Sequence, residues 1–299
     1  MTLGAVVPVY NRRANLELLL ASLEKQTNDD FVLVVVDDGC TDGSDQLLEQ
    51  AAATPFWQDR LRVVKAGPHQ GIRIGRARNI GAANLPAGVT SMVMLDSDLV
   101  LQPDAFAKIS ELTRSHPDSV LLGPVHWLPR LEHDEVRAEV AAGRIAELRD
   151  SALILDSEAP VPMPDQDEGT LVGPEIRFSL FGGVAPVDPE EPVAVRPYWV
   201  IPPNSVWPVR TFWQLGGFDE RLSGYGEHDF ALGVRMEQAG VYVLARPELW
   251  ALHLWHPKDT TSQAPEPVDL AAKVEEHGMA AQVFMMVRRG EWNLDAVTS

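Results

Sequence analysis

The chain has 299 residues, of which 45% are hydrophobic, so it can bury the core of one large α/β domain or of two smaller ones. Its net charge of −18 disfavours a nucleic acid or another polyanion as partner, because most of the surface would repel it. The single cysteine, Cys40, excludes an intramolecular disulfide and a zinc site built from several cysteines.

The apolar runs are all shorter than the roughly 20 residues that a membrane-spanning helix needs, so the sequence predicts no transmembrane segment. The first residues, MTLGAVVPVYNRR, have no basic region ahead of their apolar run, unlike a signal peptide. We therefore expect a cytoplasmic protein, and the low cysteine content fits a reducing compartment.

Four short apolar runs in the first hundred residues are typical of parallel strands covered on both faces. They are LGAVVPV (3–9), FVLVVV (31–36), LRVVK (61–65) and SMVML (91–95). Three helical segments separate them: leucines at helical spacing over 16–23, a segment with Ser44 as its expected N-cap, and residues 75–85. This alternation predicts an α/β fold with a doubly wound, mostly parallel central sheet and helices on both faces.

The alternation continues with a helix that should open at Pro103 and Asp104, and it fades after about residue 120. One amphipathic helix is predicted over 136–148, a proline-rich acidic loop or lid over 159–208, a helix over 228–240 that ends at Gly240, and a strand over 241–246. We interpret residues 1–120 and 121–260 as two halves of one domain, followed by a partly helical tail at 261–299.

Polar residues follow each of the four predicted strands. They are Asn11 and Arg12, Asp37 and Asp38, several residues within 69–78, and the pair Asp96 and Asp98. Ligands of open α/β sheets bind beyond the carboxyl ends of the strands, so these groups should meet at one rim. Two carboxylates this close would raise each other's pKa unless a cation lay nearby, and Mg²⁺ or Mn²⁺ suits such oxygen ligands. Alternatively, the two aspartates form turn or cap interactions.

Six segments of the sequence match, in order and approximate spacing, the motifs of one enzyme family. They are VVPVYNR (6–12), VVVDDGCTDGS (34–44), GIRIGRARNIG (71–81), LDSD (95–98), WQLGGFDE (213–220) and YGEHDFALGVR (225–235). From residue 3 to about 256 the chain thus resembles the family 2 glycosyltransferases of the GT-A fold. The resemblance implies a nucleotide-sugar donor, with a UDP-sugar favoured over a GDP-sugar, a Mn²⁺ or Mg²⁺ cofactor, and a small-molecule or saccharide acceptor.

The resemblance also implies a donor site in the first half of the chain. Its members would be Pro8, Val9, Tyr10 and Arg12 around the base and ribose, Asp38 as acceptor for the uracil imide N–H, Arg78 on the ribose or diphosphate, Asp96 on ribose and metal with Ser97 beside it, and Asp98 as the main metal ligand. Asp37 is expected to cap a turn, Asn79 to be structural, and Gly81 to let a helix approach the sheet.

Transfer with inversion of configuration needs a base for the acceptor hydroxyl. In the family this base is the aspartate of a Glu-Asp pair at a helix start, and the matching pair here is His228-Asp229. Glu227 could instead take the place of the glutamate through a one-residue shift, and both alignments stay open. For Asp229 itself, the alternative to the base is a carboxylate that the helix macrodipole stabilises.

The acceptor side would include Trp207, Gly217, Asp219, Glu227 and His228, with Gly216 and Gly217 in a tight turn. Tryptophans are also common core residues, which is the alternative for Trp207.

Related enzymes complete the metal shell with a histidine, and His253 and His256 both fall close to the expected position. In an extended chain only one of them faces the metal unless the chain turns before Pro257, and we favour His253.

Two other functions fit parts of the sequence. A non-catalytic nucleotide-sugar-binding module would bind the donor without turnover. A metal-dependent hydrolase would use Asp96, Asp98, His253 and His256, but no HExxH segment supports it. Neither G-x-G-x-x-G nor a P-loop motif follows a predicted strand, which disfavours NAD(P) enzymes and P-loop NTPases. The sequence leaves the donor sugar, the acceptor and the oligomeric state open.

Overall fold

The computed structural model describes residues 2–128, 131–152, 193–195, 202–222 and 227–256. Its strands are β1 (Leu3–Val9), β2 (Phe31–Asp37), β3 (Leu61–Lys65), β4 (Ser91–Met94), β5 (Leu99–Leu101), β6 (Val120–Leu122), β7 (Val125–Trp127), β8 (Val193–Val195), β9 (Ser205–Pro208), β10 (Val243–Ala245) and β11 (Ala251–His253). Its helices are α1 (Arg13–Leu23), α2 (Ser44–Ala52), α3 (Ile74–Ala83), α4 (Ala105–Ser115), α5 (His133–Ala142), α6 (Ile145–Ala152), α8 (Val209–Gln214), α9 (Glu227–Gln238) and the short 3-10 helix η2 (Pro247–Leu249).

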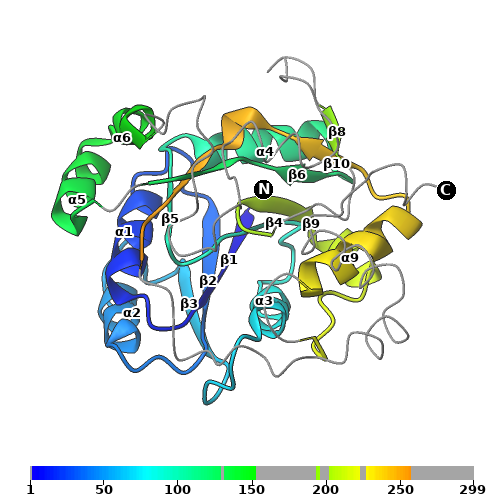
Figure 1. The fold of residues 1–299 in the computed structure, drawn as a ribbon, viewed down its shortest axis with the longest axis horizontal. Helices are drawn as coiled ribbons and strands as arrows, with labels where there is room; N and C mark the ends of the chain where they lie inside the picture. Colours follow the sequence, from blue (N-terminus) through cyan, green and yellow to red (C-terminus); the bar gives the residue numbers. More distant parts are fainter. Residues whose placement is uncertain (1, 129–130, 153–192, 196–201, 223–226, 257–299) are drawn as a thin grey trace, which may run out of the picture.

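The strands form an eight-stranded sheet in the order β3-β2-β1-β4-β9-β6-β10-β8 and a three-stranded sheet in the order β5-β11-β7 (Figure 1). Strand β1 pairs in parallel with β2 and β4, and β2 pairs in parallel with β3, as the sequence predicts. Helices α1, α2 and α3 connect these strands in turn. The register pairs Val9 with Asp37 and Asp37 with Lys65, so the carboxyl ends of these strands lie at one edge.

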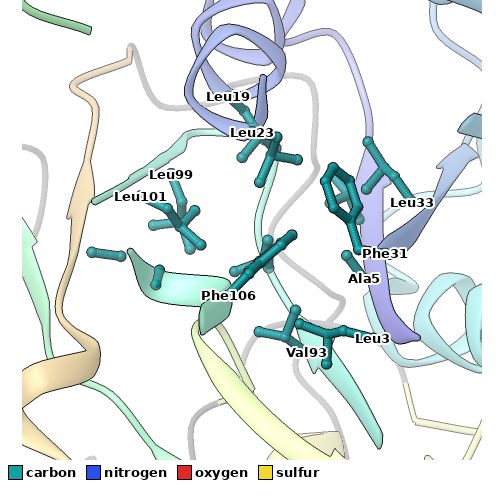
Figure 2. Close-up of a cluster of buried hydrophobic side chains, with 14 of the residues drawn as sticks. Leu3, Ala5, Leu19, Leu23, Phe31, Leu33, Val93, Leu99, Leu101 and Phe106 are labelled. Carbon is teal, nitrogen blue, oxygen red and sulfur yellow. The ribbon is translucent and has the colours of Figure 1, made fainter. Parts of the chain in front are cut away.

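Strand β1 contributes side chains to two hydrophobic cores, because successive residues of a strand point to opposite faces of the sheet. Leu3, Ala5 and Val7 pack with residues of α1, α2 and α4 on one face, and Val6 packs with residues of α3, α8 and α9 on the other. Figure 2 shows the first of these cores, where Phe31 and Phe106 lie among leucines of α1. Helices therefore cover both faces, as predicted for a doubly wound sheet.

The prediction of a loop or lid over 159–208 is wrong at its described end. Strand β9 runs antiparallel between β4 and β6 inside the large sheet, and β8 pairs antiparallel with β10 at its edge. Val206 and Trp207 are buried on opposite faces of β9, one in each core. This strand escapes a periodicity analysis because it has only four residues, the last of which is Pro208. Residues 153–192, residues 196–201 and the predicted tail at 261–299 lie outside the described residues.

The single amphipathic helix predicted over 136–148 is two helices, α5 and α6, since Gly143 adopts a φ of +71° and ends α5. The apolar residues of both helices nevertheless share one cluster with Leu18 and Trp250. Two smaller corrections concern boundaries. Ser44 is the first residue of α2 instead of its N-cap, and the predicted strand at 241–246 is confined to β10.

None of the helices in the described ranges is long and apolar enough to cross a lipid bilayer.

Phe106→Ala should lower the free energy of unfolding by about 3–5 kcal/mol, because it removes a fully buried ring and leaves a cavity. The ring lies 4.9 Å from that of Phe31 in an edge-to-face arrangement, which adds to the loss. Urea denaturation followed by circular dichroism measures the change. Tyr242→Ala is the control, since Tyr242 is 68% exposed, and a similar loss in both variants would contradict the assignment of Phe106 to the core.

Candidate active site

Asp98 forms a compact group with His253 and His256. Nε2 of His253 lies 3.4 Å from Oδ1 of Asp98, and Nε2 of His256 lies 3.1 Å from Oδ2. The potential ligand atoms of the three residues lie within 4.8 Å of one another. Strand β11 brings the histidines here by pairing antiparallel with β5, and the backbone N–H of Leu254 donates to the carbonyl of Asp98 over 2.8 Å.

Both histidines lie next to Asp98, and the preference for His253 as the metal ligand stays a prediction. His253 is the last residue of β11, and His256 lies three residues beyond its end.

The Asp98 group has the properties of a divalent-metal site. Asp98 is buried, and its Oδ1 makes no hydrogen bond within the parts of the chain that the structure describes. Burial acts to raise the pKa of Asp98, but the charge of His253 and the hydrogen bond with His256 outweigh it and lower this pKa to about 2. An ionised carboxylate beside two imidazoles is a donor set that suits a divalent transition metal.

Arg78 joins Asp96 to Asp229. Its Nη2 donates to Oδ1 of Asp96 over 2.9 Å, and its Nη1 lies 3.5 Å from Oδ1 of Asp229. The side chain of Arg78 is only 2% exposed and is engaged by two carboxylates, and its predicted contact with the ribose or diphosphate stays a prediction. Burial raises the pKa of Asp96 even though the Arg78 charge opposes this. Asp96 is not a member of the group around Asp98 that can hold a metal.

Asp229 is the third residue of α9 and has a second neighbour in His228, whose Nε2 lies 3.0 Å from Oδ1 of Asp229. His228 is buried against the ring of Phe218, with ring centroids 5.7 Å apart. The imidazole of His228 therefore acts on the rim only by contacting the carboxylate of Asp229. The side chain of Glu227 lies outside the described side chains, so the one-residue shift that the sequence allows stays open.

The turn that precedes α9 is tied to α3 and to α9 itself. Asn79 accepts a hydrogen bond from the Phe218 N–H and donates one to the Phe218 carbonyl, over 2.8 and 2.9 Å. Arg235 donates to the carbonyl of Gly217 over 2.7 Å. Gly216 and Gly217 have φ values of +82° and +66°, which confirms the predicted tight turn. The structural role predicted for Asn79 is also confirmed.

Gly81 allows the close approach of α3 to the sheet that the sequence predicts. A Cβ at this position would lie 2.3 Å from Cγ1 of Val6. Asp219, which the sequence assigns to the acceptor side, is paired with Arg221, whose Nη2 lies 2.6 Å from Oδ2 of Asp219.

The predicted place of Trp207 on the acceptor side is wrong. Its side chain is fully buried in β9, and its indole N–H donates to Oγ of Ser205 over 2.7 Å. It is a core residue, which is the alternative that the sequence left open. Trp213, by contrast, is 41% exposed.

The region predicted to bind a base follows β1 and β2. Asp37 accepts hydrogen bonds from the N–H groups of Gly39 and Cys40, which confirms its role as a turn cap. Pro8 and Val9 are buried in β1, and the Val9 carbonyl accepts a hydrogen bond from the N–H of Asp38. Arg12 donates to the carbonyl of Asn11, which adopts a φ of +48°. Ser97 is buried between the two acidic groups of the rim.

The sequence gives no role to His69, yet this residue contacts two predicted base-site residues. Its Nδ1 lies 2.9 Å from Oδ2 of Asp38, and its ring stacks on Tyr10 with centroids 3.5 Å apart and planes 8° apart. Burial raises the pKa of Asp38, while the hydrogen bond with His69 acts against that shift. The only sequence signal for His69 is its place in the polar stretch after β3.

Comparisons with known proteins agree with this architecture. Residues 5–140 match the model of the family described as Glycosyl transferase family 2. Validoxylamine A glucosyltransferase of Streptomyces hygroscopicus subsp. jinggangensis is 28% identical over 270 residues, which cover 85% of this chain and 56% of that protein. The uncharacterized glycosyltransferase YfnE of Bacillus subtilis is 25% identical over 272 residues, covering 88% and 67%. The chain spans about half the length of the validoxylamine A glucosyltransferases it matches.

Among solved structures, S. aureus TarS 1–349 in complex with UDP-GlcNAc superposes with a TM-score of 0.59 at 17% identity, over 88% of this chain and 61% of that chain. The same TarS fragment in complex with UDP gives a TM-score of 0.56. The fold is thus that of the GT-A glycosyltransferases. Residues 5–140, somewhat less than half of the chain, are thus similar to glycosyl transferase family 2.

Cys40, whose N–H donates to Asp37, should react slowly with the thiol reagent DTNB at pH 8 in the folded protein and rapidly in urea. Burial, reinforced by the negative charge of Asp37, raises the pKa of Cys40 to about 12, so almost no thiolate is present. The rate of colour development measures this, with a small free thiol as reference. A folded-state rate equal to that of the reference would contradict the enclosed environment.

Proposed function

We propose that this protein is a metal-dependent glycosyltransferase that moves a sugar from a UDP-sugar to a hydroxyl of a small-molecule or saccharide acceptor, with inversion of configuration. The observation that carries the proposal is the juxtaposition, just beyond β4, of the Asp98 group with the Asp96, Arg78 and Asp229 group. The names of the relatives and the UDP-GlcNAc bound to TarS support a UDP-sugar as donor.

Asp98, His253 and His256 would hold the divalent ion, and Mn²⁺ matches two imidazole ligands better than Mg²⁺, which prefers oxygen. When bound, the ion supplies a positive charge that stabilises the departing diphosphate. Asp38 would orient the base. Asp96, which is hydrogen-bonded to Arg78, would contact the donor as well.

Asp229 would act as the general base. Its carboxylate is partly exposed, and Arg78 and His228 fix it from two directions. As the acceptor oxygen attacks the anomeric carbon, the hydroxyl proton would pass to Asp229, and the bond from that carbon to the diphosphate would break. Attack from the face opposite the leaving group inverts the configuration.

The hydrolase that would use four metal ligands is disfavoured, because Asp96 pairs with Arg78 instead of joining the two histidines.

A binding module without turnover is separated from a transferase by incubating the protein with UDP- and GDP-sugars and Mn²⁺. Release of the nucleoside diphosphate supports the transferase, and tight binding without release supports the module.

Asp98→Asn should weaken Mn²⁺ binding and lower UDP release from UDP-sugars by about 100-fold, since it removes the anionic ligand of the proposed site. Calorimetric titration with Mn²⁺ and a UDP-release assay measure the two effects. Asp104→Asn serves as the control, because the side chain of Asp104 is 51% exposed and pairs with Lys108 on the surface. Unchanged Mn²⁺ affinity in a folded Asp98→Asn protein would contradict the metal site.

Asp229→Asn should lower kcat by a factor of about 10² to 10⁴, the usual contribution of a general base, with little change in KM for the donor. The amide keeps the shape of the side chain but cannot accept the proton. Asp134→Asn is the matched control, since its carboxylate is 98% exposed on α5. A kcat within threefold of the wild type, or a product that retains configuration by NMR, would count against Asp229 as the base of an inverting reaction.

A further inference from the structure

His69 occupies the two groups that the proposed function reserves for a nucleobase. Its imidazole lies parallel to the ring of Tyr10 at a centroid distance of 3.5 Å, and its Nδ1 is hydrogen-bonded to Asp38 at 2.9 Å. A uracil ring would use the same two contacts, because it is a flat ring that stacks on aromatic side chains and has an imide N–H that a carboxylate can accept. A uracil on the same face of Tyr10 and the same oxygen of Asp38 would exclude the imidazole.

The backbone around His69 is held in place by its neighbours. A Cβ at Gly39, where φ is +84°, would lie 2.5 Å from the backbone nitrogen of His69, so the turn after β2 and the segment after β3 are in close contact. The N–H of Ala66 donates to the carbonyl of Asp37 over 2.8 Å, and Arg76 donates to the carbonyl of Ala66. The position of the imidazole between Tyr10 and Asp38 therefore follows from a packed backbone.

We propose that His69 is a specificity-determining residue that competes with the nucleobase for Tyr10 and Asp38. This inference rests on the proposed function, because it takes Asp38 as the acceptor for the base. A base binds only after the imidazole has turned aside, and the apparent affinity falls by the fraction of molecules in which Tyr10 and Asp38 are free. This loss of apparent affinity applies only to ligands that carry a base, and the affinity for a bare diphosphate is unaffected.

The test compares the wild type, His69→Ala and His116→Ala as full-length proteins. Calorimetry with Mn²⁺ present measures the affinities for UDP and for inorganic pyrophosphate, which has no base. His116 is a suitable control because it follows α4, far along the chain from β1 and β2. Circular dichroism establishes that each variant is folded.

We expect His69→Ala to bind UDP about tenfold more tightly than the wild type, because a stack and a hydrogen bond no longer compete. Its affinity for pyrophosphate should be unchanged, and His116→Ala should match the wild type for both ligands. Equal or weaker UDP binding by His69→Ala, with a wild type that binds UDP, overturns the inference alone. It would mean that the imidazole contacts the base directly or plays no part. Absence of UDP binding in all three proteins overturns the proposed UDP-sugar donor, and the inference with it.

A second measurement follows the imidazole itself. The ring protons of His69, identified by their loss in His69→Ala, should be shifted upfield in NMR spectra by the ring of Tyr10. Addition of UDP should move them to the positions of an unstacked histidine, while pyrophosphate should leave them in place. Signals that stay shifted at saturating UDP would overturn the proposed displacement.

Discussion

The buried guanidinium of Arg78 is the contact on which the arrangement of the rim depends. It comes from α3, and it lies against Asp96 after β4 and against Asp229 at the start of α9, residues that are 133 positions apart in sequence. A buried cation is costly unless carboxylates compensate it, and each carboxylate in turn needs the cation. The three groups therefore hold α3, the end of β4 and α9 in one relative position. The ring of Phe218, 5.7 Å from the guanidinium, fills the space beside them.

A second constraint comes from the small sheet. Strand β11 has three residues, and its pairing with β5 and β7 brings His253 next to Asp98, which lies between β4 and β5 in the chain. The two sheets thus meet at Asp98, whose own backbone carbonyl accepts a hydrogen bond from the residue after His253. Main-chain pairing consequently positions the backbone of Asp98 and of His253.

The sequence predicts the first half of the fold well, because continuous β-branched runs mark buried parallel strands and leucines at helical spacing mark the helix between two of them. It also singles out Asp98, His253 and His256, which the fold brings together. It does not predict that Arg78 is enclosed, that His69 stacks on Tyr10, or that Trp207 belongs to the core. Each of these depends on partners brought together only by the tertiary fold. Strand β9 escapes the sequence analysis for a different reason, since four residues that end in a proline are too few to show a period.

The position of β9 has a consequence for how the chain must be assembled. Strands β4 and β6 both lie within residues 5–140, yet they are not neighbours, because β9 from residues 205–208 lies between them and pairs with each. A fragment cut after the matched segment would leave two unpaired strand edges and an open slot in the sheet, which invites association with other chains. During synthesis, the sheet stays incomplete until more than 200 residues have been made. The later part of the chain thus completes a sheet that the first 140 residues begin.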